Sequence, residues 1–444
     1  MADVLYKKPA SPLCGQIQIP GSKSAMHRRI LTAALTGRDT VIEGADESAD
    51  MEATLRGVRL LGMDTEYLAE SRQIILSAPS TVPSAMAESH TGVQALDCGE
   101  SGTTLRLLIP IFAALGRRIC FTGSGLLPRR PIGIYEMLLP EHGVAVKTTG
   151  GLPFEINGQL QSGTYSLPGN VSSQFISGLL LALPLLKSGS SRIVLTSPLE
   201  SAGYVELTLR ILADSGIVIH NTQNGWTVPG RQHYLAENPR IEGDWSHAAF
   251  FLSHAAVSAG GAIDIRGLDN SSIQGDRACA EIYRRFGLHV EETESGITAF
   301  NKNAAMPYRG LKAIHLDASQ IPDLVPAIAV CAAFAQGQTR IYNAGRLRLK
   351  ESDRLQGMAD AINAVGGKAE AAGDELIITG SETLGGGSCL GLNDHRILMA
   401  MSAAGLGSLE PVRVTDAESI RKSYPNFYRD YRGLGGIADV ISMG

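Results

Sequence analysis

Six segments of this chain share one pattern, in which a strand-like run leads through a short polar turn into an apolar helix. They start near residues 22, 100, 171, 244, 321 and 393, so successive starts lie 71 to 78 residues apart. Such regular spacing indicates an internal repeat. Each segment continues with a second amphipathic helix that ends at a glycine turn before a further strand. The sequence therefore predicts six strand–helix–strand–helix–strand units.

The number of units predicts the domain organisation. A chain of 444 residues is too long for one ordinary hydrophobic core. Three units make one domain, so we expect an α/β protein of two similar domains with a boundary near residue 241. The first domain is predicted to span 22–241. The second is predicted to span 242–444 and to be completed by the N-terminal strand within 1–21, because the sixth unit is short.

Composition excludes several classes of function. Aromatic residues make up 5% of the chain and the net charge is −5, which disfavours a broad nucleic-acid surface. The longest apolar run, 175–186, is too short to span a bilayer and contains a proline. The N-terminus does not resemble a signal peptide, and the six cysteines are widely spaced without a CxxC motif. We therefore expect a cytoplasmic protein with reduced thiols and no membrane or nucleic-acid partner.

The repeated helix starts predict an anion-binding site. A helix N-terminus presents free backbone N–H groups and the positive end of the helix dipole. Although the chain is acidic overall, its cations gather at these starts and in nearby loops, as in "GSKSAMHRR" and "GRLRLKESDR". Arginine binds both oxygens of a carboxylate or phosphate at once. The expected ligand is a small molecule that carries phosphate and carboxylate groups.

Each of these residues also has a purely structural interpretation. On this interpretation Ser172 and Ser173 are ordinary helix caps, and Asp323 in "QIPDLVP" is a helix-capping residue as well. Glu351 and its neighbours in "KESDR" can form ion pairs on a solvated helix face, and His395 can be structural. "GSKS" lacks the upstream glycine of a phosphate-binding P-loop. No HExxH motif or Cys/His cluster is present, so no metal site is expected.

Eight motifs in order along the chain resemble one family. They are "PGSKS", "SGTT-x-R", "RPIG", "VSSQF", "IPD", "KESDR", "NDHR" and "KSYP". This set is similar to that of the 5-enolpyruvylshikimate-3-phosphate synthases, a branch of the enolpyruvyltransferases. The resemblance implies the inside-out α/β barrel fold of that family, with two domains of three repeats and the active site in the interdomain cleft. It also implies a monomer that needs no cofactor or metal.

The reaction implied by the resemblance joins two anionic substrates. The enolpyruvyl group of phosphoenolpyruvate is transferred to the 5-hydroxyl of shikimate 3-phosphate, and inorganic phosphate is released through a tetrahedral intermediate. This step belongs to the biosynthesis of aromatic amino acids. Each substrate carries one phosphate and one carboxylate, so lysines, arginines and helix starts must offset their mutual repulsion.

The resemblance also assigns roles to individual residues. The expected shikimate 3-phosphate ligands are Lys23, Ser24, Arg28, Ser172, Ser173, Gln174, Ser201, Tyr204, Asp323 and Lys350. The expected phosphoenolpyruvate ligands are Lys23, Gly102, Arg130, Gln174, Arg354, Arg396 and Lys422. The expected catalytic residues are Lys23, Asp323, Glu351 and Lys422. Among these, Asp323 is the general base at the 5-hydroxyl, and Glu351, a buried acid with a raised pKa, protonates the methylene carbon.

The chain departs from the family pattern at Glu100, where many members carry asparagine, and at Arg346, which receives no role. Gly102 keeps the open pocket associated with glyphosate sensitivity, a hypothesis that competition against phosphoenolpyruvate tests. Two alternatives remain open. One is the sister enzyme that acts on UDP-N-acetylglucosamine, although the loop 123–133 lacks the cysteine on which that enzyme relies. The other is a relative that binds anions without catalysis.

Overall fold

Two compact units make up the chain in the computed structural model, which describes residues 2–78, 92–236, 238–258 and 260–442. One unit comprises residues 21–241, and the other comprises residues 242–444 together with 1–20. We call them the 21–241 unit and the 242–444 unit. Each has its own cluster of buried hydrophobic side chains.

The 21–241 unit alternates strands with helices. Its described helices are α1 (Lys23–Ala34), α2 (Ala49–Leu60), α3 (Gly102–Ala114), α4 (Gly133–Glu141), α5 (Ser173–Ala182) and α6 (Ala202–Asp214), with the 3₁₀ turns η2 (Leu127–Arg129) and η3 (Leu183–Leu185). Its described strands are β3 (Thr40–Glu43), β4 (Asp64–Leu68), β5 (Gln73–Ser77), β6 (Gln94–Asp97), β7 (Ile119–Thr122), β8 (Val144–Lys147), β9 (Phe154–Gly158), β10 (Thr164–Leu167), β11 (Ser190–Leu195), β12 (His220–Thr222) and β13 (Gly225–Pro229).

The 242–444 unit follows the same alternation. Its described helices are α7 (Trp245–Val257), α8 (Cys279–Phe286), α9 (Val325–Ala332), α10 (Arg354–Ala364), α11 (His395–Gly407) and α12 (Phe427–Gly433), with the 3₁₀ turns η4 (Gly275–Ala278), η5 (Pro307–Gly310), η6 (Pro322–Leu324), η7 (Gly345–Leu349) and η8 (Ala417–Lys422). Its described strands are β1 (Ala2–Lys7), β2 (Gly15–Gln18), β14 (Ala262–Arg266), β15 (His289–Thr293), β16 (Gly296–Phe300), β17 (His315–Asp317), β18 (Gln338–Tyr342), β19 (Lys368–Ala372), β20 (Glu375–Thr379), β21 (Gly387–Cys389), β22 (Val412–Val414) and β23 (Ile437–Ser442).

Each complete repeat has one more strand than the sequence pattern predicted. The order β6-β7-β9-β8 recurs as β10-β11-β13-β12 and as β17-β18-β20-β19. In each sheet the first two strands are parallel, and the last two form an antiparallel hairpin. The hairpin was missed because its turns are short. Gly373, with φ of +59°, and Asp374 are the whole connection between β19 and β20.

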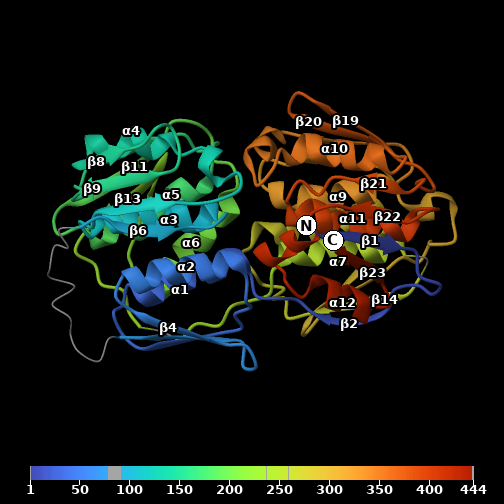
Figure 1. Ribbon diagram of the computed structural model, residues 1–444, viewed down its shortest axis with the longest axis horizontal. Coiled ribbons are helices and arrows are strands. Elements are labelled where there is room, and N and C mark those ends of the chain that lie inside the picture. The colour runs from blue at the N-terminus through green and yellow to red at the C-terminus, as the bar shows by residue number, and fades with distance from the viewer. Residues whose placement is uncertain (1, 79–91, 237, 259, 443–444) are drawn as a thin grey trace. The chain divides into compact units, whose positions relative to one another are not determined.

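The N-terminal segment is divided between two sheets of the 242–444 unit. Strand β1 lies between β22 and β23, pairing Ala2 with Ser442, so both ends of the chain lie side by side (Figure 1). Strand β2, directly before Pro20, instead pairs in parallel with β14. The sequence predicted that an N-terminal strand completes the sixth repeat, and β1 lies in that place. The pattern did not reveal the second strand, β2, which opens the fourth repeat.

The first repeat obtains its opening strand from the end of its own unit. Its sheet, β3-β5-β4, has three named strands. Beside β3, the backbone N–H of Glu43 donates to the carbonyl of Pro239, and the N–H of Ile241 donates to the carbonyl of Glu43. Arg240 thus forms a parallel bridge with Glu43. This closure brings residues 239–241 beside the helix start that follows Gly21.

The first helix of each repeat forms the interior of its unit. Every residue of α7, α9 and α11 is buried, and Figure 1 shows these helices inside the unit with strands around them. Helices α3 and α5 are buried along nearly their whole length. A helix that is apolar on all sides requires a buried position. The apolar run 175–186 is therefore a core helix, and the starts of these helices carry the motifs.

Candidate functional site

Serine caps begin the three inner helices of the 21–241 unit. The side chains of Ser22, Ser101 and Ser172 accept hydrogen bonds from backbone N–H groups in the first turns of α1, α3 and α5. The predicted starts near 22, 100 and 171 therefore fall within one residue of the observed caps. No acidic residue occupies the first turn of these helices, so no side chain of the first turn itself offsets the positive dipole end.

Lys23 is the first residue of α1. Its Nζ lies 3.1 Å from Oδ2 of Asp50, which belongs to the first turn of α2. Both side chains are mostly buried, with 14% and 10% of their surfaces exposed. The carboxylate holds the ammonium group in place at the helix start. Lys23 thus adds a fixed positive charge at the start of α1, where an anionic ligand is expected to bind.

Arg28, one turn further along α1, is buried among uncharged groups. Its Nε donates to Oγ1 of Thr208 at 2.6 Å, and its Nη2 donates to Oγ of Ser177 and to the carbonyl of Tyr204. Its Nη1 donates to the carbonyl of Ser24. Burial lowers the pKa of Arg28 to about 10. Since its partners are neutral throughout the described residues, the guanidinium keeps an uncompensated positive charge.

Gln174 is oriented by a residue to which the sequence analysis gave no role. Its Oε1 accepts a hydrogen bond from Nη1 of Arg106 at 2.7 Å, and its Nε2 donates to Oγ1 of Thr103 at 2.8 Å. Arg106 also donates to the carbonyl of Pro131, in the loop that carries Arg130. Arg106 is the last residue of the "SGTT-x-R" motif, and that position was the available signal.

Gly102 lies against two arginines. A Cβ atom at this position would lie 2.8 Å from Nη1 of Arg130 and 3.0 Å from Nη1 of Arg106. The two guanidinium groups thus approach the backbone where α3 begins. Two cations beside a helix N-terminus form an anion-binding environment, and a larger residue at 102 would displace at least one of them.

The predicted phosphate-binding serines lie at the starts of α5 and α6. Ser173 is buried in the first turn of α5, and Ser201 is buried directly before α6. Ser201 adopts φ of +54°, which costs about 1–2 kcal/mol for a residue other than glycine. The two helices are joined further in, where the hydroxyls of Ser177 and Thr208 lie 2.8 Å apart. These two hydroxyls accept hydrogen bonds from the buried guanidinium of Arg28.

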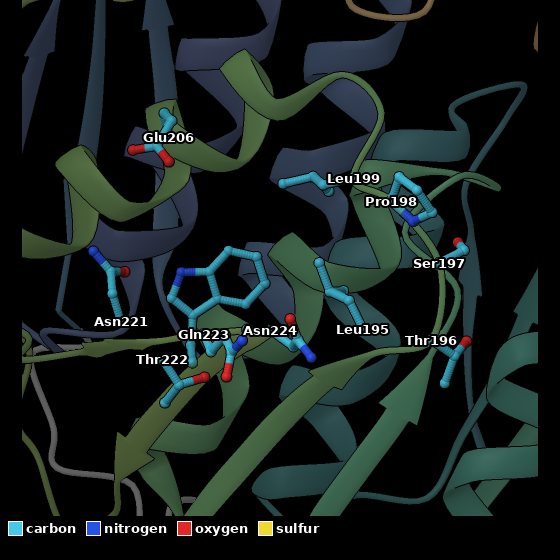
Figure 2. A pocket seen from close by; sticks show the side chains of 12 residues that line it. Leu195, Thr196, Ser197, Pro198, Leu199, Glu206, Asn221, Thr222, Gln223 and Asn224 are labelled. Atoms are coloured by element: carbon cyan, nitrogen blue, oxygen red, sulfur yellow. The ribbon is translucent and has the colours of Figure 1, made fainter.

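A separate hollow of about 570 Å³ lies between the loop 195–199 and the residues 221–226. Figure 2 shows its lining, with Glu206 on α6 and Asn221 on β12. The loop that forms one wall leads into Ser201. None of the predicted site residues lines this hollow, so we do not assign the predicted chemistry to it.

Asp323 is the centre of a charged cluster in the 242–444 unit. Its Oδ1 lies 3.1 Å from both Nζ of Lys350 and Nη1 of Arg354, and its Oδ2 lies 3.5 Å from Nη2 of Arg396. Nη1 of Arg396 also donates to the backbone carbonyl of Asp323. Burial by itself raises the pKa of Asp323, but these three cations outweigh it and hold the pKa well below its usual range. The carboxylate is therefore ionised, and it is not a simple helix cap.

Lys350 lies in the same surroundings, and its pKa is lowered as well. Burial lowers its pKa, and Arg346 and Arg354 lower it further, whereas Asp323 opposes the shift. A lysine with a lowered pKa gives up its proton more readily than an exposed one. The two groups stabilise each other's charged form, because the carboxylate raises the pKa of Lys350 and the ammonium group lowers that of Asp323.

Arg354 is bound by three carboxylates. Its Nε donates to Oδ2 of Asp394 at 2.7 Å, and its Nη2 lies 2.7 Å from Oε2 of Glu351. Its side chain is 1% exposed, and its pKa is raised, since the carboxylates outweigh the effect of burial. The alternative of ion pairs on a solvated helix face is therefore wrong for Arg354. Asp394 also accepts from Ser352 and caps α11.

Arg396 and Lys422 each donate a hydrogen bond to a neutral oxygen. Nη2 of Arg396 donates to Oγ of Ser246 at 3.0 Å, in addition to its contacts with Asp323. Nζ of Lys422 donates to the carbonyl of Asn393 at 2.5 Å. Both cations are buried. His395 is buried too, with its Nδ1 4.0 Å from Asp394, a position that favours the structural interpretation of this residue.

Each unit thus gathers one part of the predicted set. The 21–241 unit contains Lys23, Ser24, Arg28, Gly102, Arg130, Ser172, Ser173, Gln174, Ser201 and Tyr204. The 242–444 unit contains Asp323, Lys350, Glu351, Arg354, Arg396 and Lys422. Within the second set, Asp323 contacts Lys350, Arg354 and Arg396, and Arg354 also contacts Glu351. Lys422 is linked to this cluster through the chain: it binds the carbonyl of Asn393, and the next residue, Asp394, binds Arg354.

Comparison with known proteins identifies a family that matches the chain. The family described as EPSP synthase (3-phosphoshikimate 1-carboxyvinyltransferase) matches residues 7–431. A 3-phosphoshikimate 1-carboxyvinyltransferase of Clostridium kluyveri is 39% identical over 434 residues, which cover 97% of each chain. That of Clostridium novyi is 38% identical over 437 residues, which cover 98% of each chain.

Solved structures share the fold over the full length. The EPSP synthase of Acinetobacter baumannii superposes with a TM-score of 0.79 at 28% identity and covers both chains completely. The enolpyruvyl transferase NikO of Streptomyces tendae gives a TM-score of 0.75 at 16% identity and covers 100% of this chain and 99% of its own. In the part of the chain that the structure describes, no helix is long and apolar enough to cross a membrane.

Proposed function

The chain belongs to the EPSP synthase family, and from this premise we propose that it transfers the enolpyruvyl group of phosphoenolpyruvate to the 5-hydroxyl of shikimate 3-phosphate. The observation that carries the proposal is the Asp323 carboxylate, held between Lys350, Arg354 and Arg396. A dense group of cations around one ionised carboxylate suits a reaction in which anions are bound and a hydroxyl is deprotonated.

Asp323 accepts the proton of the 5-hydroxyl. In the protein without substrates, three cations lower its pKa, which makes it a weak base. Phosphate or carboxylate groups bound to Arg354, Arg396 or Lys350 add negative charge beside it, and this raises its pKa. Asp323 thus becomes a stronger base when the substrates are bound.

Glu351 acts on the other reactant. It donates a proton to the methylene carbon of phosphoenolpyruvate, while the 5-oxygen bonds to the adjacent carbon and gives the tetrahedral intermediate. Glu351 then removes a proton from the new methyl group, and the bond to the phosphate oxygen breaks, which restores the double bond and releases inorganic phosphate. Glu351 lies 2.7 Å from Nη2 of Arg354, so an anionic substrate on Arg354 would compete with Glu351 for that guanidinium.

The binding roles are divided by chemistry. We propose that Arg28 binds the carboxylate of shikimate 3-phosphate, and that Ser172, Ser173 and Ser201 bind its phosphate, with Ser24, Gln174 and Tyr204 along the same molecule. Lys23 contacts both substrates. Gly102, Arg130, Arg354, Arg396 and Lys422 bind phosphoenolpyruvate. The support is the buried positive charge of Arg28 and the approach of Arg130 to Gly102 at the start of α3.

Phosphate release tests the proposal. The purified chain should release phosphate only when phosphoenolpyruvate and shikimate 3-phosphate are both present, and mass spectrometry should detect the enolpyruvyl ether. Release with UDP-N-acetylglucosamine as the acceptor would identify the sister enzyme instead, and no release with either acceptor would favour a non-catalytic relative. Arg130→Ala should raise the KM for phosphoenolpyruvate, with the exposed neighbour Arg129→Ala as its matched control.

The proposal includes a cytoplasmic monomer without nucleic-acid or membrane partners. Six free cysteines suit a reducing compartment, and the net charge of −5 disfavours binding to polyanions. Light scattering coupled to size-exclusion chromatography should give one chain of 47.0 kDa. A larger particle at assay concentration would contradict the monomer.

A further inference from the structure

The turn before α11 has an unusual backbone. Leu392 and Asn393 are consecutive residues with φ of +54° and +51°. This left-handed region is disfavoured for residues other than glycine, and asparagine tolerates it better than leucine does. Two such residues in succession require other contacts that hold the turn. Strain of this kind is found at functional sites when the surrounding structure enforces it.

Thr415 and Asp416 supply those contacts. Oδ2 of Asp416 accepts hydrogen bonds from the backbone N–H of Asn393 at 3.1 Å and from Oγ1 of Thr415 at 2.9 Å. Oγ1 of Thr415 in turn accepts from the backbone N–H of Gly391 at 3.0 Å. A Cβ at position 391 would lie 2.2 Å from the Thr415 carbonyl, so the turn packs directly on this segment.

The turn presents a carbonyl to a predicted catalytic lysine. The Asn393 peptide unit carries the carbonyl that accepts from Nζ of Lys422 at 2.5 Å. Asp416 lies directly before η8, and Lys422 is the last residue of η8. Asp416 therefore adjoins both partners of the interaction: its side chain holds the turn that carries the acceptor, and its backbone directly precedes the segment that ends at the donor.

We propose that Asp416 is a positioning residue for Lys422, which it orients through the strained Leu392–Asn393 turn. Asp416 contacts neither the charged cluster of Asp323 nor any predicted binding residue among its described hydrogen bonds. This inference rests on the proposed function, in which Lys422 binds phosphoenolpyruvate. Loss of the Asp416 carboxylate lets the turn leave the left-handed region and moves the carbonyl away from Lys422.

Steady-state kinetics with each substrate varied in turn test the inference. Asp416→Ala should raise the KM for phosphoenolpyruvate about tenfold and leave the KM for shikimate 3-phosphate within twofold. Asp416→Asn keeps an oxygen that can accept both hydrogen bonds, so its KM for phosphoenolpyruvate should stay within threefold of the wild type. Thr415→Val, which retains the side-chain shape, should give an intermediate increase and provides the test if Asp416→Ala does not fold.

A second substitution separates positioning from general destabilisation. Glycine adopts the left-handed conformation without penalty, so Leu392→Gly added to Asp416→Ala should recover most of the lost affinity for phosphoenolpyruvate. A loss of affinity caused by a weakened fold would not recover. The matched control is Asp269→Ala, which likewise removes one backbone and one hydroxyl hydrogen bond from an aspartate of the 242–444 unit. Its KM values should equal those of the wild type.

The outcomes distinguish this inference from the proposed function. A wild-type chain that releases no phosphate overturns the proposed function, and the inference falls with it. An active wild type whose Asp416→Ala and Thr415→Val variants keep the wild-type KM for phosphoenolpyruvate overturns the inference alone. Equal increases in both KM values, without recovery by Leu392→Gly, overturn it as well.

Discussion

Each unit contains an arginine whose side chain is almost completely buried, Arg28 in one and Arg354 in the other, but the surroundings of the two differ. Arg28 in the 21–241 unit contacts hydroxyl and carbonyl oxygens, and burial lowers its pKa to about 10. Arg354 in the 242–444 unit contacts three carboxylates, which raise its pKa. The charge of Arg28 thus has only neutral hydrogen-bond partners among the described residues, whereas the charge of Arg354 is balanced by carboxylates of the protein.

This difference indicates different roles for the two arginines. A buried cation without a carboxylate is costly to maintain, and a bound anion relieves that cost. Arg28 therefore has the surroundings of a ligand-binding arginine. Arg354 contacts Asp323, Glu351 and Asp394, so its main role is to position the carboxylates that are proposed to transfer protons. Its predicted contact with phosphoenolpyruvate remains a prediction and requires that the substrate share the guanidinium with these acids.

The largest expected effect is on turnover and concerns the acids of the 242–444 unit. Asp323→Ala and Glu351→Gln should each lower kcat by about 10²- to 10⁴-fold, the usual contribution of a positioned acid or base. The KM values should change by much less, because the binding cations remain. Steady-state phosphate release measures both parameters. A variant with near-wild-type kcat would remove that residue from the mechanism and the proton-handling role from its cluster.

The next effect tests the contrast between the two arginines directly. Arg354→Met leaves Asp394 buried without its partner and should lower the free energy of unfolding by about 3–5 kcal/mol. Arg28→Met removes a buried charge that has neutral partners, so the melting temperature should stay the same or rise. Its KM for shikimate 3-phosphate should increase about 10- to 100-fold, since a hydrogen bond to a charged group contributes about 1.5–3 kcal/mol.

Thermal unfolding and kinetics on the same preparations check this pair, and each variant is the control for the other. Comparable destabilisation by both substitutions would show that Arg28 is also structural. An unchanged KM for shikimate 3-phosphate in Arg28→Met would contradict its binding role.

The smallest effect concerns pH and the buried His27 of α1. Burial, together with Lys23 and Arg28, lowers its pKa well below 6.5. Below about pH 6.5 the unfolded chain therefore binds a proton that the folded chain does not, and stability falls by up to about 1.4 kcal/mol per pH unit. His27→Asn removes this contribution. Its melting temperature should decline less than that of the wild type between pH 7 and pH 5.5, by the equivalent of about 1 kcal/mol.

His254→Asn provides a comparison within the 242–444 unit, because burial lowers the pKa of His254 to about 3. This variant should also show a smaller decline of the melting temperature between pH 7 and pH 5.5 than the wild type. If neither variant alters the pH dependence of the melting temperature, the buried histidines do not control acid stability.

The helix starts could be predicted from the sequence because capping is local. Ser22, Ser101, Ser172 and Asp394 each bond a backbone N–H two or three residues away, so their pattern is visible in a short window. The repeat then follows from the spacing of these caps. The fourth strand was missed because a turn of only two residues, as between β12 and β13 or between β19 and β20, gives little loop signal to separate the two strands.

The partners of the site residues could not be predicted in this way. Arg354 and Asp394 are 40 positions apart, and Arg28 and Thr208 are 180 apart. The family motifs pointed to the residues of both clusters. Arg106 received no role, because its importance depends on the orientation of Gln174 and on the approach of Arg130 to Gly102, which are visible only after folding.

The sequence by itself determined the internal repeat of the chain, the residue at which each inner helix begins, and the cations that lie near each helix start. These features depend on hydrogen bonds and dipoles within a few residues. Only the tertiary structure decided that Arg28 is buried among neutral oxygens, that Arg354 is bound by carboxylates, and that β1 and β2 join different sheets. Such pairings depend on how distant segments pack, and no local pattern records which partner a buried charge will meet.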